Sequence, residues 1–210
     1  SKLSPDAMTN DSPNPGRTQK VASARSLIAD GRVPLVTPWE LLGEKNSVGP
    51  SGFMRILTRS YTLPDGRASN WDLLDGKQTV AVLAFTSESK IILARQYRPG
   101  PDLILNEMPG GAVDPGEQPA EAAIRELLEE TGYAGEIEML GSTWLSASAT
   151  TQRFVAIARN CHQISAPRPT GDEFCAPVLV DLQEFRQQLR EGALTDVDLG
   201  YLALDLVGYL

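Results

Sequence analysis

The chain has 210 residues, of which 41% are hydrophobic, and a formal net charge of -8. This length suffices for one domain of ordinary size with an N-terminal extension. The acidic balance excludes nucleic-acid binding through a general basic surface. No apolar run reaches the roughly 18 residues that a membrane helix needs, and the N-terminus lacks a signal-peptide core. We therefore expect neither a nucleic-acid nor a membrane partner.

The cysteine and histidine content indicates no zinc site. Cys161, Cys175 and the single histidine, His162, do not occur at the spacings typical of zinc ligands. Both thiols are expected to be reduced, in a cytoplasmic protein.

The first third of the chain predicts an extension and a small β region. Residues 1–20 are rich in Ser, Pro, Asn and Asp, so we expect a disordered extension, part of which can derive from an expression vector. Residues 33–41 and 52–63 are expected to be extended, the latter followed by a turn at 64–66. Residues 21–75 are thus assigned to a small antiparallel β region, and 76–210 to the main domain.

The main domain alternates apolar strands with helical patterns. We expect strands at 79–85, 90–97, 103–107, 136–146, 154–158 and 177–181, and helices at 118–131, 181–191 and 196–208. This alternation predicts an α+β fold in which a mixed sheet lies between helices.

The helix expected over 118–131 has clear termini and an apolar stripe. Pro119 is placed as a first-turn proline, and Gly132 as the residue after the C-terminus. The residues at helical spacing that we expect to pack on the sheet are Ala120, Ala123, Ile124, Leu127 and Leu128.

The opposite side of this helix is acidic. Glu126, Glu129 and Glu130 converge within one turn, where like charges repel by roughly a few tenths of a kcal/mol per pair. Arg125 is the only cation between residues 110 and 133. Hard divalent cations such as Mg²⁺ bind carboxylates, waters and substrate phosphates. The pattern therefore predicts a metal site for phosphate chemistry.

Residues 111–133 resemble the box of the Nudix hydrolases, which reads G, five residues, E, seven residues, then R-E-U-x-E-E-x-G-U with U a bulky apolar residue. The matching residues are Gly111, Glu117, Arg125, Glu126, Leu127, Glu129, Glu130, Gly132 and Tyr133. So many constrained positions make the motif a specific one. The resemblance implies the Nudix α/β/α sandwich with a mixed β-sheet, preceded by the small N-terminal antiparallel β element.

Two segments upstream resemble the ADP-ribose pyrophosphatase branch of that family. Residues 95–99, Arg-Gln-Tyr-Arg-Pro, and 107–111, Glu-Met-Pro-Gly-Gly, look like its RQYR segment and the E-x-P-x-G segment before the box. An arginine at a strand end can donate to two phosphate oxygens at once. Arg98 is our first choice for a substrate contact and Arg95 our second, and Glu107 is grouped with them. The alternative is that each arginine is a surface residue paired with a glutamate such as Glu107.

The resemblance also implies roles for the box residues. Glu126 and Glu130 would be the principal ligands of Mg²⁺ or Mn²⁺, with the Gly110 carbonyl as a backbone ligand. Glu129 would be a further ligand or a catalytic base. Three residues would support them, Arg125 and Glu117 by orienting the loop and the ligands, and Gly111 by letting the backbone approach the ions.

In the ADP-ribose branch the implied general base lies on a loop after the box. The matching region is 171–174, where Glu173 is the candidate base and Asp172 the fallback. The alternative is an ordinary acidic loop in solvent.

The resemblance implies a metal-dependent pyrophosphatase that converts ADP-ribose, or a related nucleoside diphosphate sugar, to AMP or another nucleoside monophosphate and a sugar phosphate. Residues 145–153 depart from the branch, because the proline that marks ADP-ribose specificity is missing and Ala149 lies near its place. Alternative substrates are a dinucleotide, a flavin or an oxidised nucleotide. A non-catalytic nucleotide-sugar sensor is a further alternative, although sensors tend to lose box carboxylates.

The N-terminal β region has an implied role of its own. Trp71 lies where N-terminal strands of this branch form the nucleobase site, often across a dimer. Stacking of a base on an aromatic ring contributes about 1 to 3 kcal/mol. The alternative is that Trp71 is a core residue. The resemblance also implies a homodimer formed through residues 30–75.

Overall fold

A computed structural model describes the chain from residue 36 to residue 210. The disordered extension expected over 1–20 lies outside these residues. The chain divides into two compact units, of which one contains Thr58–Trp71 with the described residues before Asn46, and the other contains Asn46–Leu57 and Asp72–Leu210. No helix in the described part is long and apolar enough to cross a membrane.

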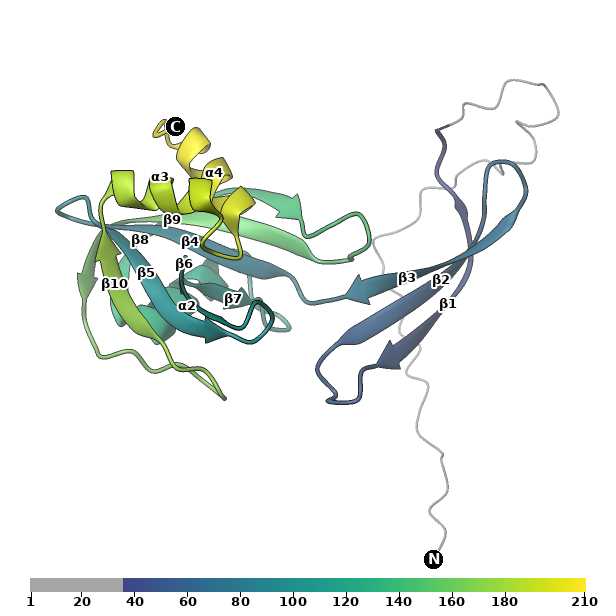
Figure 1. The fold of residues 1–210 in the computed structure, drawn as a ribbon, viewed down its shortest axis with the longest axis horizontal. Coiled ribbons are helices and arrows are strands. Elements are labelled where there is room, and N and C mark those ends of the chain that lie inside the picture. Colours follow the sequence, from purple (N-terminus) through teal and green to yellow (C-terminus); the bar gives the residue numbers. More distant parts are fainter. Residues whose placement is uncertain (1–35) are drawn as a thin grey trace, which may run out of the picture. The chain divides into compact units, whose positions relative to one another are not determined.

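The N-terminal β region is a three-stranded sheet in the order β1-β2-β3 (Figure 1). Its strands are β1 (Glu40–Val48), β2 (Arg55–Thr62) and β3 (Ala68–Asp75). The expected antiparallel element is confirmed, with two corrections. Among the described residues the first strand begins at Glu40, and residues 36–39, which were expected to be extended, are not part of it, because a proline such as Pro38 cannot donate to a strand ladder. The third strand was not expected, because its sequence is rich in Asp and Asn.

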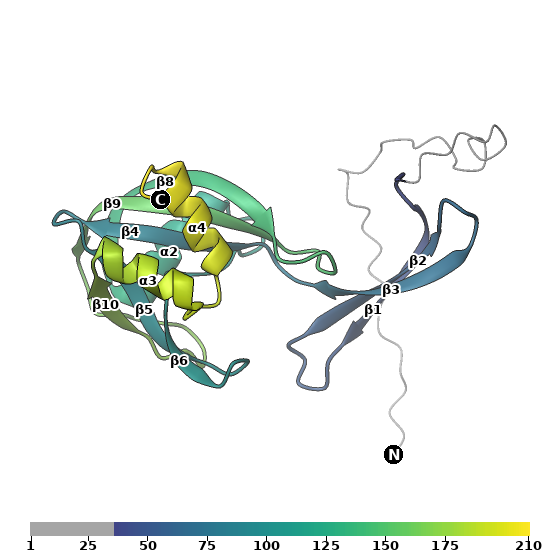
Figure 2. The same cartoon turned by 45° about the horizontal axis from the view of Figure 1, so that its top comes forward.

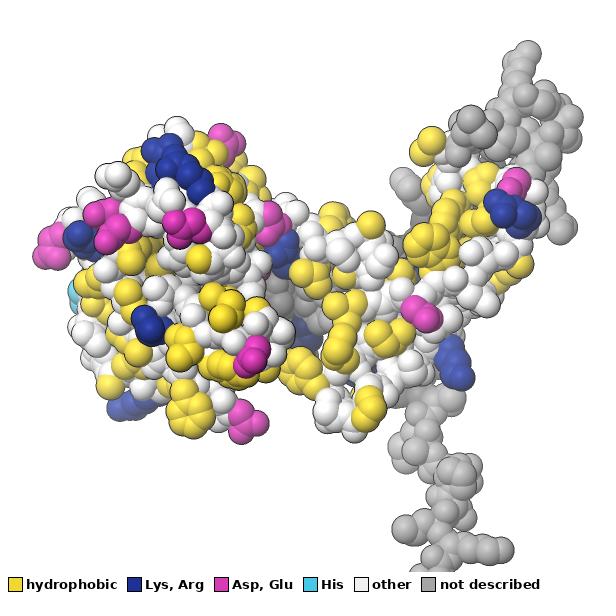
Figure 3. All heavy atoms as spheres, in the orientation of Figure 1, with side chains coloured by type: hydrophobic (Ala, Val, Ile, Leu, Met, Phe, Trp, Pro, Cys, Tyr) yellow, Lys and Arg dark blue, Asp and Glu magenta, His cyan; other side chains and the backbone are white. Residues whose placement is uncertain are grey.

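The three-stranded sheet has little core of its own. Every residue of β1 is exposed. The Trp39 ring lies 5.5 Å from Tyr61 and 5.4 Å from Trp71, measured between ring centroids. Hydrophobic side chains therefore lie on the surface of this sheet (Figure 3), among them Leu41 and Leu42.

The main domain is built on a mixed sheet with the strand order β10-β5-β4-β9-β8. Its strands are β4 (Thr79–Thr86), β5 (Ile91–Arg98), β6 (Leu103–Glu107), β7 (Gly110–Ala112), β8 (Tyr133–Trp144), β9 (Gln152–Gln163) and β10 (Ala176–Val180). Strands β4 and β9 are parallel, whereas the other pairs are antiparallel. The expected mixed sheet is confirmed, with the short β7 as an addition.

Helices cover both faces of this sheet (Figures 1 and 2). They are α2 (Pro119–Thr131), α3 (Leu182–Glu191) and α4 (Val197–Leu206). One hydrophobic core lies between the sheet and α2, and includes Val82 and Leu127. A second core lies on the side of α3 and α4, and includes Leu83 and Phe185. The expected α/β/α sandwich is confirmed.

Strand alternation decides which side chains of β5 face α2. Ile92 belongs to the core on the α2 side, whereas Ile91 and Leu93 belong to the core on the α3 side. Successive side chains of a strand point to opposite faces. Gln96 therefore faces α2, and Arg95 faces α3.

The sheet splits next to β5, and the split gives the glycine loop its place. Strand β4 pairs with β5 only at Ala84 and Phe85, after which β6 pairs with β5 and β7 pairs with β4. A side chain at Gly110 would overlap the backbone of β4, and one at Gly111 would overlap the Glu126 carboxylate. Both positions therefore require glycine for close approach.

Helix α2 has the expected termini but a different buried face. Pro119 occupies its first turn and Gly132 follows its C-terminus with φ 76°. Ala123 and Leu127 are buried as expected, but Ile124 is 53% exposed. The buried face turns away from Ile124 and includes two glutamates instead, Glu126 and Glu130.

We expect Gly132→Ala to destabilise the main domain more than Gly116→Ala does. Both glycines have positive φ, 76° and 84°, which alone costs alanine about 1 to 2 kcal/mol. A Cβ at Gly132 would also overlap the Ser165 carbonyl, whereas nothing lies within 4 Å at Gly116. Urea unfolding followed by circular dichroism measures both variants. Equal losses would contradict the predicted overlap.

Candidate functional site

The most deeply buried acidic group on α2 is Glu130, whose residue exposure is 2%. Its Oε2 accepts a hydrogen bond from the Gly110 N–H at 2.9 Å, and its Oε1 accepts one from Gln96 Nε2 at 3.2 Å. The Cys175 thiol lies 3.8 Å from Oε1. Burial raises the pKa of Glu130 to about 7, although the Gly110 N–H opposes the shift.

Three other carboxylates share this region of the protein. Burial raises the pKa of Glu126, and the charges of Glu129 and Glu173 raise it further against the opposing effect of Arg125. The charges of Glu126 and Glu173 also raise the pKa of Glu130. The loop that carries Glu173 therefore lies close enough to the box helix for its carboxylate to act on both of these glutamates.

Arg125 joins the box helix to the loop before it. Its Nε and Nη2 donate to the two oxygens of Glu117, both at 2.9 Å, and Nη2 also donates to the Ala112 carbonyl. Its Nη1 donates to Glu126 Oε1 at 2.7 Å and lies 3.5 Å from Glu129. Hydrogen bonds from Arg125 lower the pKa of Glu117 to about 2. Arg125 thus fixes both the loop and the direction of a box carboxylate.

Arg98 lies between a buried carboxylate and the glutamates of α2. Its side chain is 29% exposed, and its Nε lies 3.7 Å from Glu107 Oε1. Its positive charge opposes the rise in the pKa of Glu130. An anion bound near Glu126, Glu129 and Glu130 could therefore contact Arg98.

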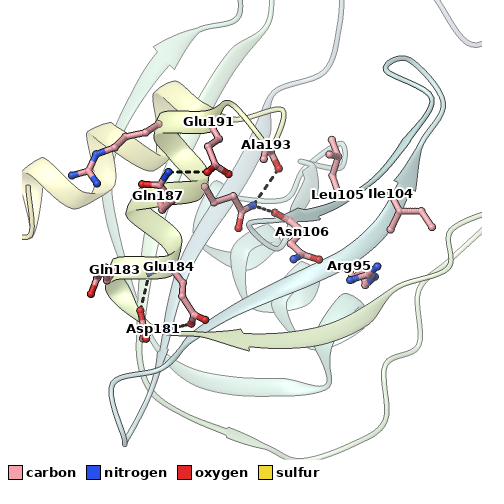
Figure 4. Close-up of a pocket in the computed structure, with 12 residues that line it drawn as sticks. Arg95, Ile104, Leu105, Asn106, Asp181, Gln183, Glu184, Gln187, Glu191 and Ala193 are labelled. Carbon is pink, nitrogen blue, oxygen red and sulfur yellow. Dashed lines mark hydrogen bonds between the residues drawn. The ribbon is translucent and has the colours of Figure 1, made fainter.

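Two other predicted substrate contacts have different surroundings. Arg95 lines a cavity of about 720 Å³ together with residues of α3, on the opposite face of the sheet (Figure 4). Glu107 is fully buried and accepts hydrogen bonds from Thr195. We therefore assign neither side chain to a substrate contact. Trp71 belongs to the other compact unit, so its role in base binding stays a prediction.

The side chains near Glu130 suit a hard divalent cation by their chemistry. Among residues 36–210, no group of three or more His, Cys, Asp and Glu side chains is close enough as placed to hold a metal. However, the charges of Glu129 and Glu173 raise the pKa of Glu126, and those of Glu126 and Glu173 raise the pKa of Glu130, and a bound cation would oppose both effects. The glycine loop also leaves the space beside Glu126 free of a side chain. An all-oxygen donor set of this kind fits Mg²⁺ or Mn²⁺.

Sequence reasoning missed three polar neighbours of the site. Gln96 could have been found, because its strand position places it on the same face as Arg98. Nothing in the sequence points to Cys175 or Thr195, which come from distant segments and reach Glu130 and Glu107 only in the folded chain.

Comparison with known families and proteins shows to which proteins the chain is similar. Residues 76–197 match the model of the NUDIX domain. A methanol dehydrogenase activator from Bacillus methanolicus is 33% identical over 150 residues, which are 68% of this chain and 79% of the activator.

Two further relatives match over less of their length. An ADP-ribose pyrophosphatase from Bacillus subtilis is 43% identical over 81 residues, which are 39% of this chain and 44% of the relative. An ADP-sugar pyrophosphatase from Mus musculus is 32% identical over 114 residues, which are 49% of this chain and 50% of the relative. This chain therefore spans about half or less of these two proteins.

A solved structure shares the fold. The crystal structure of an ADP compounds hydrolase superposes with a TM-score of 0.70 at 19% sequence identity, over 83% of this chain and 98% of the other.

The buried Glu130 predicts an unusual pH dependence of the metal-free protein. Its pKa is about 7 in the folded state, against an ordinary value of 4.5 for a solvated glutamate, so the folded protein holds the proton to higher pH. The stability that this proton supports is complete below pH 4.5 and is lost as the pH rises through 7. With chelator present, Glu130→Gln should therefore gain stability relative to the wild type over this interval, by on the order of 3 kcal/mol.

Urea unfolding at a series of pH values measures that difference. Added Mg²⁺ at pH 8 should raise the melting temperature of the wild type and leave that of Glu130→Gln nearly unchanged. Parallel pH profiles for the two proteins would contradict the environment assigned to Glu130.

Proposed function

The chain belongs to the Nudix family, and we propose that it is a metal-dependent pyrophosphatase of nucleoside diphosphate sugars, with ADP-ribose as the first candidate substrate. The products would be AMP, or another nucleoside monophosphate, and a sugar phosphate. The observation that carries the proposal is the group of mutually repelling carboxylates around the buried Glu130, with the arginine Arg98 beside it.

We assign the metal to the box glutamates. Glu126, Glu129, Glu130 and the Gly110 carbonyl would hold Mg²⁺ or Mn²⁺. When bound, such ions neutralise the charge of a diphosphate and lower the pKa of a bound water. Arg125 would keep Glu126 oriented through the hydrogen bond between them.

The protein's own groups would do the remaining work. Arg98 would donate hydrogen bonds to the diphosphate oxygens and orient the substrate. Glu173 would accept the proton of the attacking water, because it lies on a loop and its charge already acts on Glu126 and Glu130. The Glu130 carboxylate is held by Gln96 and Gly110, so its position is fixed before any ion binds.

The names of the relatives support the substrate class. Two relatives are named for the hydrolysis of ADP-ribose or ADP-sugars, and their matches cover parts of this chain. The departure near Ala149 leaves the identity of the sugar to experiment. A dinucleotide is the second candidate, because the relative from Bacillus methanolicus, which matches 68% of this chain, is named an activator of a dehydrogenase, and many dehydrogenases bind nicotinamide dinucleotides.

The test is phosphate release after added phosphatase, with Mg²⁺ and with chelator, on ADP-ribose, ADP-glucose, UDP-glucose, GDP-mannose, NADH and FAD. Rapid metal-dependent cleavage of ADP-ribose supports the proposal. A preference for NADH would shift it to the dinucleotide. Tight ADP-ribose binding without cleavage of any compound would overturn it in favour of a sensor.

We expect Glu130→Gln to abolish turnover and Glu173→Gln to lower kcat by roughly 100-fold or more, as for loss of a general base. Glu138→Gln is the matched control, because Glu138 is an exposed strand residue paired with Arg159. Steady-state kinetics on the preferred substrate measures all three variants. Full activity of Glu130→Gln would refute the metal assignment, and full activity of Glu173→Gln would refute the assigned base.

We also propose that the chain is a homodimer joined through its N-terminal β region, where Trp71 would stack on the nucleobase. The exposed strand β1 supports this, since an uncovered edge strand with exposed hydrophobic residues favours pairing with another chain. A second copy of this chain is the proposed occupant.

The double variant Leu41→Asp, Leu42→Asp should shift the protein from dimer to monomer, because it places two charges on β1. Sedimentation equilibrium measures the mass. Ile164→Asp serves as the control, because Ile164 is 55% exposed and lies outside this sheet. A monomeric wild type, or a variant that remains dimeric, would contradict the proposed interface.

A further inference from the structure

The Glu107 carboxylate accepts hydrogen bonds from the backbone and the side chain of one residue that is distant in the sequence, Thr195. It is the last residue of β6 and is fully buried. The backbone N–H of Thr195 lies 3.1 Å from both of its oxygens, and the Thr195 hydroxyl donates to Oε2 at 2.9 Å. Thr195 lies between α3 and α4, so it contacts Glu107 across 88 residues of sequence.

Arg98 stands beside the same carboxylate without being hydrogen-bonded to it. Its Nε lies 3.7 Å from Glu107 Oε1, which is too long for a hydrogen bond. The Arg98 Nε is also buried without a hydrogen-bond partner in the described structure. A buried carboxylate next to an arginine commonly forms two parallel hydrogen bonds with it. Here that close pair does not form.

Competition for the carboxylate oxygens explains this arrangement. Thr195 offers two donors to Glu107, and both its N–H and its hydroxyl lie within hydrogen-bond distance of Oε2, so together they fill the two acceptor positions of an oxygen that a bidentate arginine would need. Glu107 therefore attracts the Arg98 guanidinium by charge alone and does not hold it.

We propose that Thr195 is a positioning residue, which occupies Glu107 and thereby leaves the Arg98 guanidinium free to bind the substrate diphosphate. This inference rests on the proposed function, in which Arg98 contacts the phosphates. Thr195 acts only through Glu107 and does not touch the substrate.

The segment that carries Thr195 is fixed on both sides of it. Leu194 is buried in the core on the α3 side, with 4% exposure. Arg153, at the start of β9, forms an ion pair with Asp196 at 3.0 Å and a second one with Asp198. These contacts hold Thr195 in a defined position, so its N–H and hydroxyl can compete with Arg98 for the Glu107 carboxylate.

The test compares Thr195→Val with Thr195→Ser. Valine has nearly the shape of threonine but no hydroxyl, so one acceptor position of Oε2 becomes free while the backbone N–H keeps its contact, and Glu107 can pair closely with Arg98. We expect KM to rise by roughly tenfold, the equivalent of one hydrogen bond to a charged group, with kcat nearly unchanged. Thr195→Ser keeps the hydroxyl and should retain the KM of the wild type. A KM of Thr195→Val equal to that of the wild type would overturn the inference.

A double-mutant cycle separates positioning from a general structural effect. If Thr195 acts through Arg98, then Thr195→Val should add nothing to the KM of Arg98→Ala. An added rise of the same size in that background would overturn the inference. Thr86→Val is the control for loss of a threonine hydroxyl, because Thr86 Oγ1 accepts a hydrogen bond from the Lys90 N–H in a turn on another part of the sheet. It should alter stability at most, and not KM.

The same cycle is read on the binding of inorganic pyrophosphate, measured by calorimetry with Mg²⁺ present. This arm distinguishes the two failures, because it requires no turnover. If the wild type hydrolyses no compound of the panel, the proposed function fails. The positioning role is still supported in that case if Thr195→Val weakens pyrophosphate binding in the wild-type background and not in the Arg98→Ala background. If the wild type is active, and the effects of Thr195→Val and Arg98→Ala add both in KM and in pyrophosphate binding, only the positioning role fails.

Discussion

The rest of the site is arranged around one constraint, the burial of the Glu130 carboxylate on the inner face of α2. Burying a charge without partners costs several kcal/mol. This cost raises the pKa of Glu130 to about 7. The surroundings supply partial compensation from Gln96 and the Gly110 N–H. They also supply further negative charge, from Glu126 and Glu173. Such an arrangement raises the energy of the metal-free protein and lowers it when a cation binds, which suits a metal site better than a structural ion pair.

The C-terminal helices belong to the same system, although none of their residues lies in the box. Arg153 is 7% exposed, and pairs with Asp196 and Asp198 at the start of α4. Glu107 binds Thr195 one residue before that pair. Strand β6 and the glycine loop after it are thereby tied to the helices on the opposite face of the sheet. The position of Arg98 thus depends on contacts between segments about 90 residues apart, as expected where function rests on a supporting layer of hydrogen bonds.

The sequence predicted the local features of the fold and missed those set at long range. Helix α2 was predicted within a residue at each end, because Pro119 and Gly132 are local signals. Its buried face was predicted wrongly at Ile124, because periodicity assigns hydrophobic residues to the inside and cannot anticipate that the glycine loop will meet two glutamates there. Strands β3 and β7 were missed because their sequences are polar or glycine-rich, so their partners rather than their own propensities make them strands.

The two arginines of the RQYR segment show what further reasoning from the sequence could have given. Arg95 and Arg98 are three residues apart, and the strand predicted over 90–97 ends one residue before Arg98. If that strand is extended by one residue, alternation alone places the two arginines on opposite faces of the sheet, and both cannot contact the same diphosphate within one chain. Which of them faces the metal helix could not be decided from the sequence. The hydrogen bond from Gln96 to Glu130 decides it, because Gln96 and Arg98 are two residues apart in β5 and therefore face the same side of the sheet. This hydrogen bond therefore shows which arginine of the segment lies on the α2 face of the sheet.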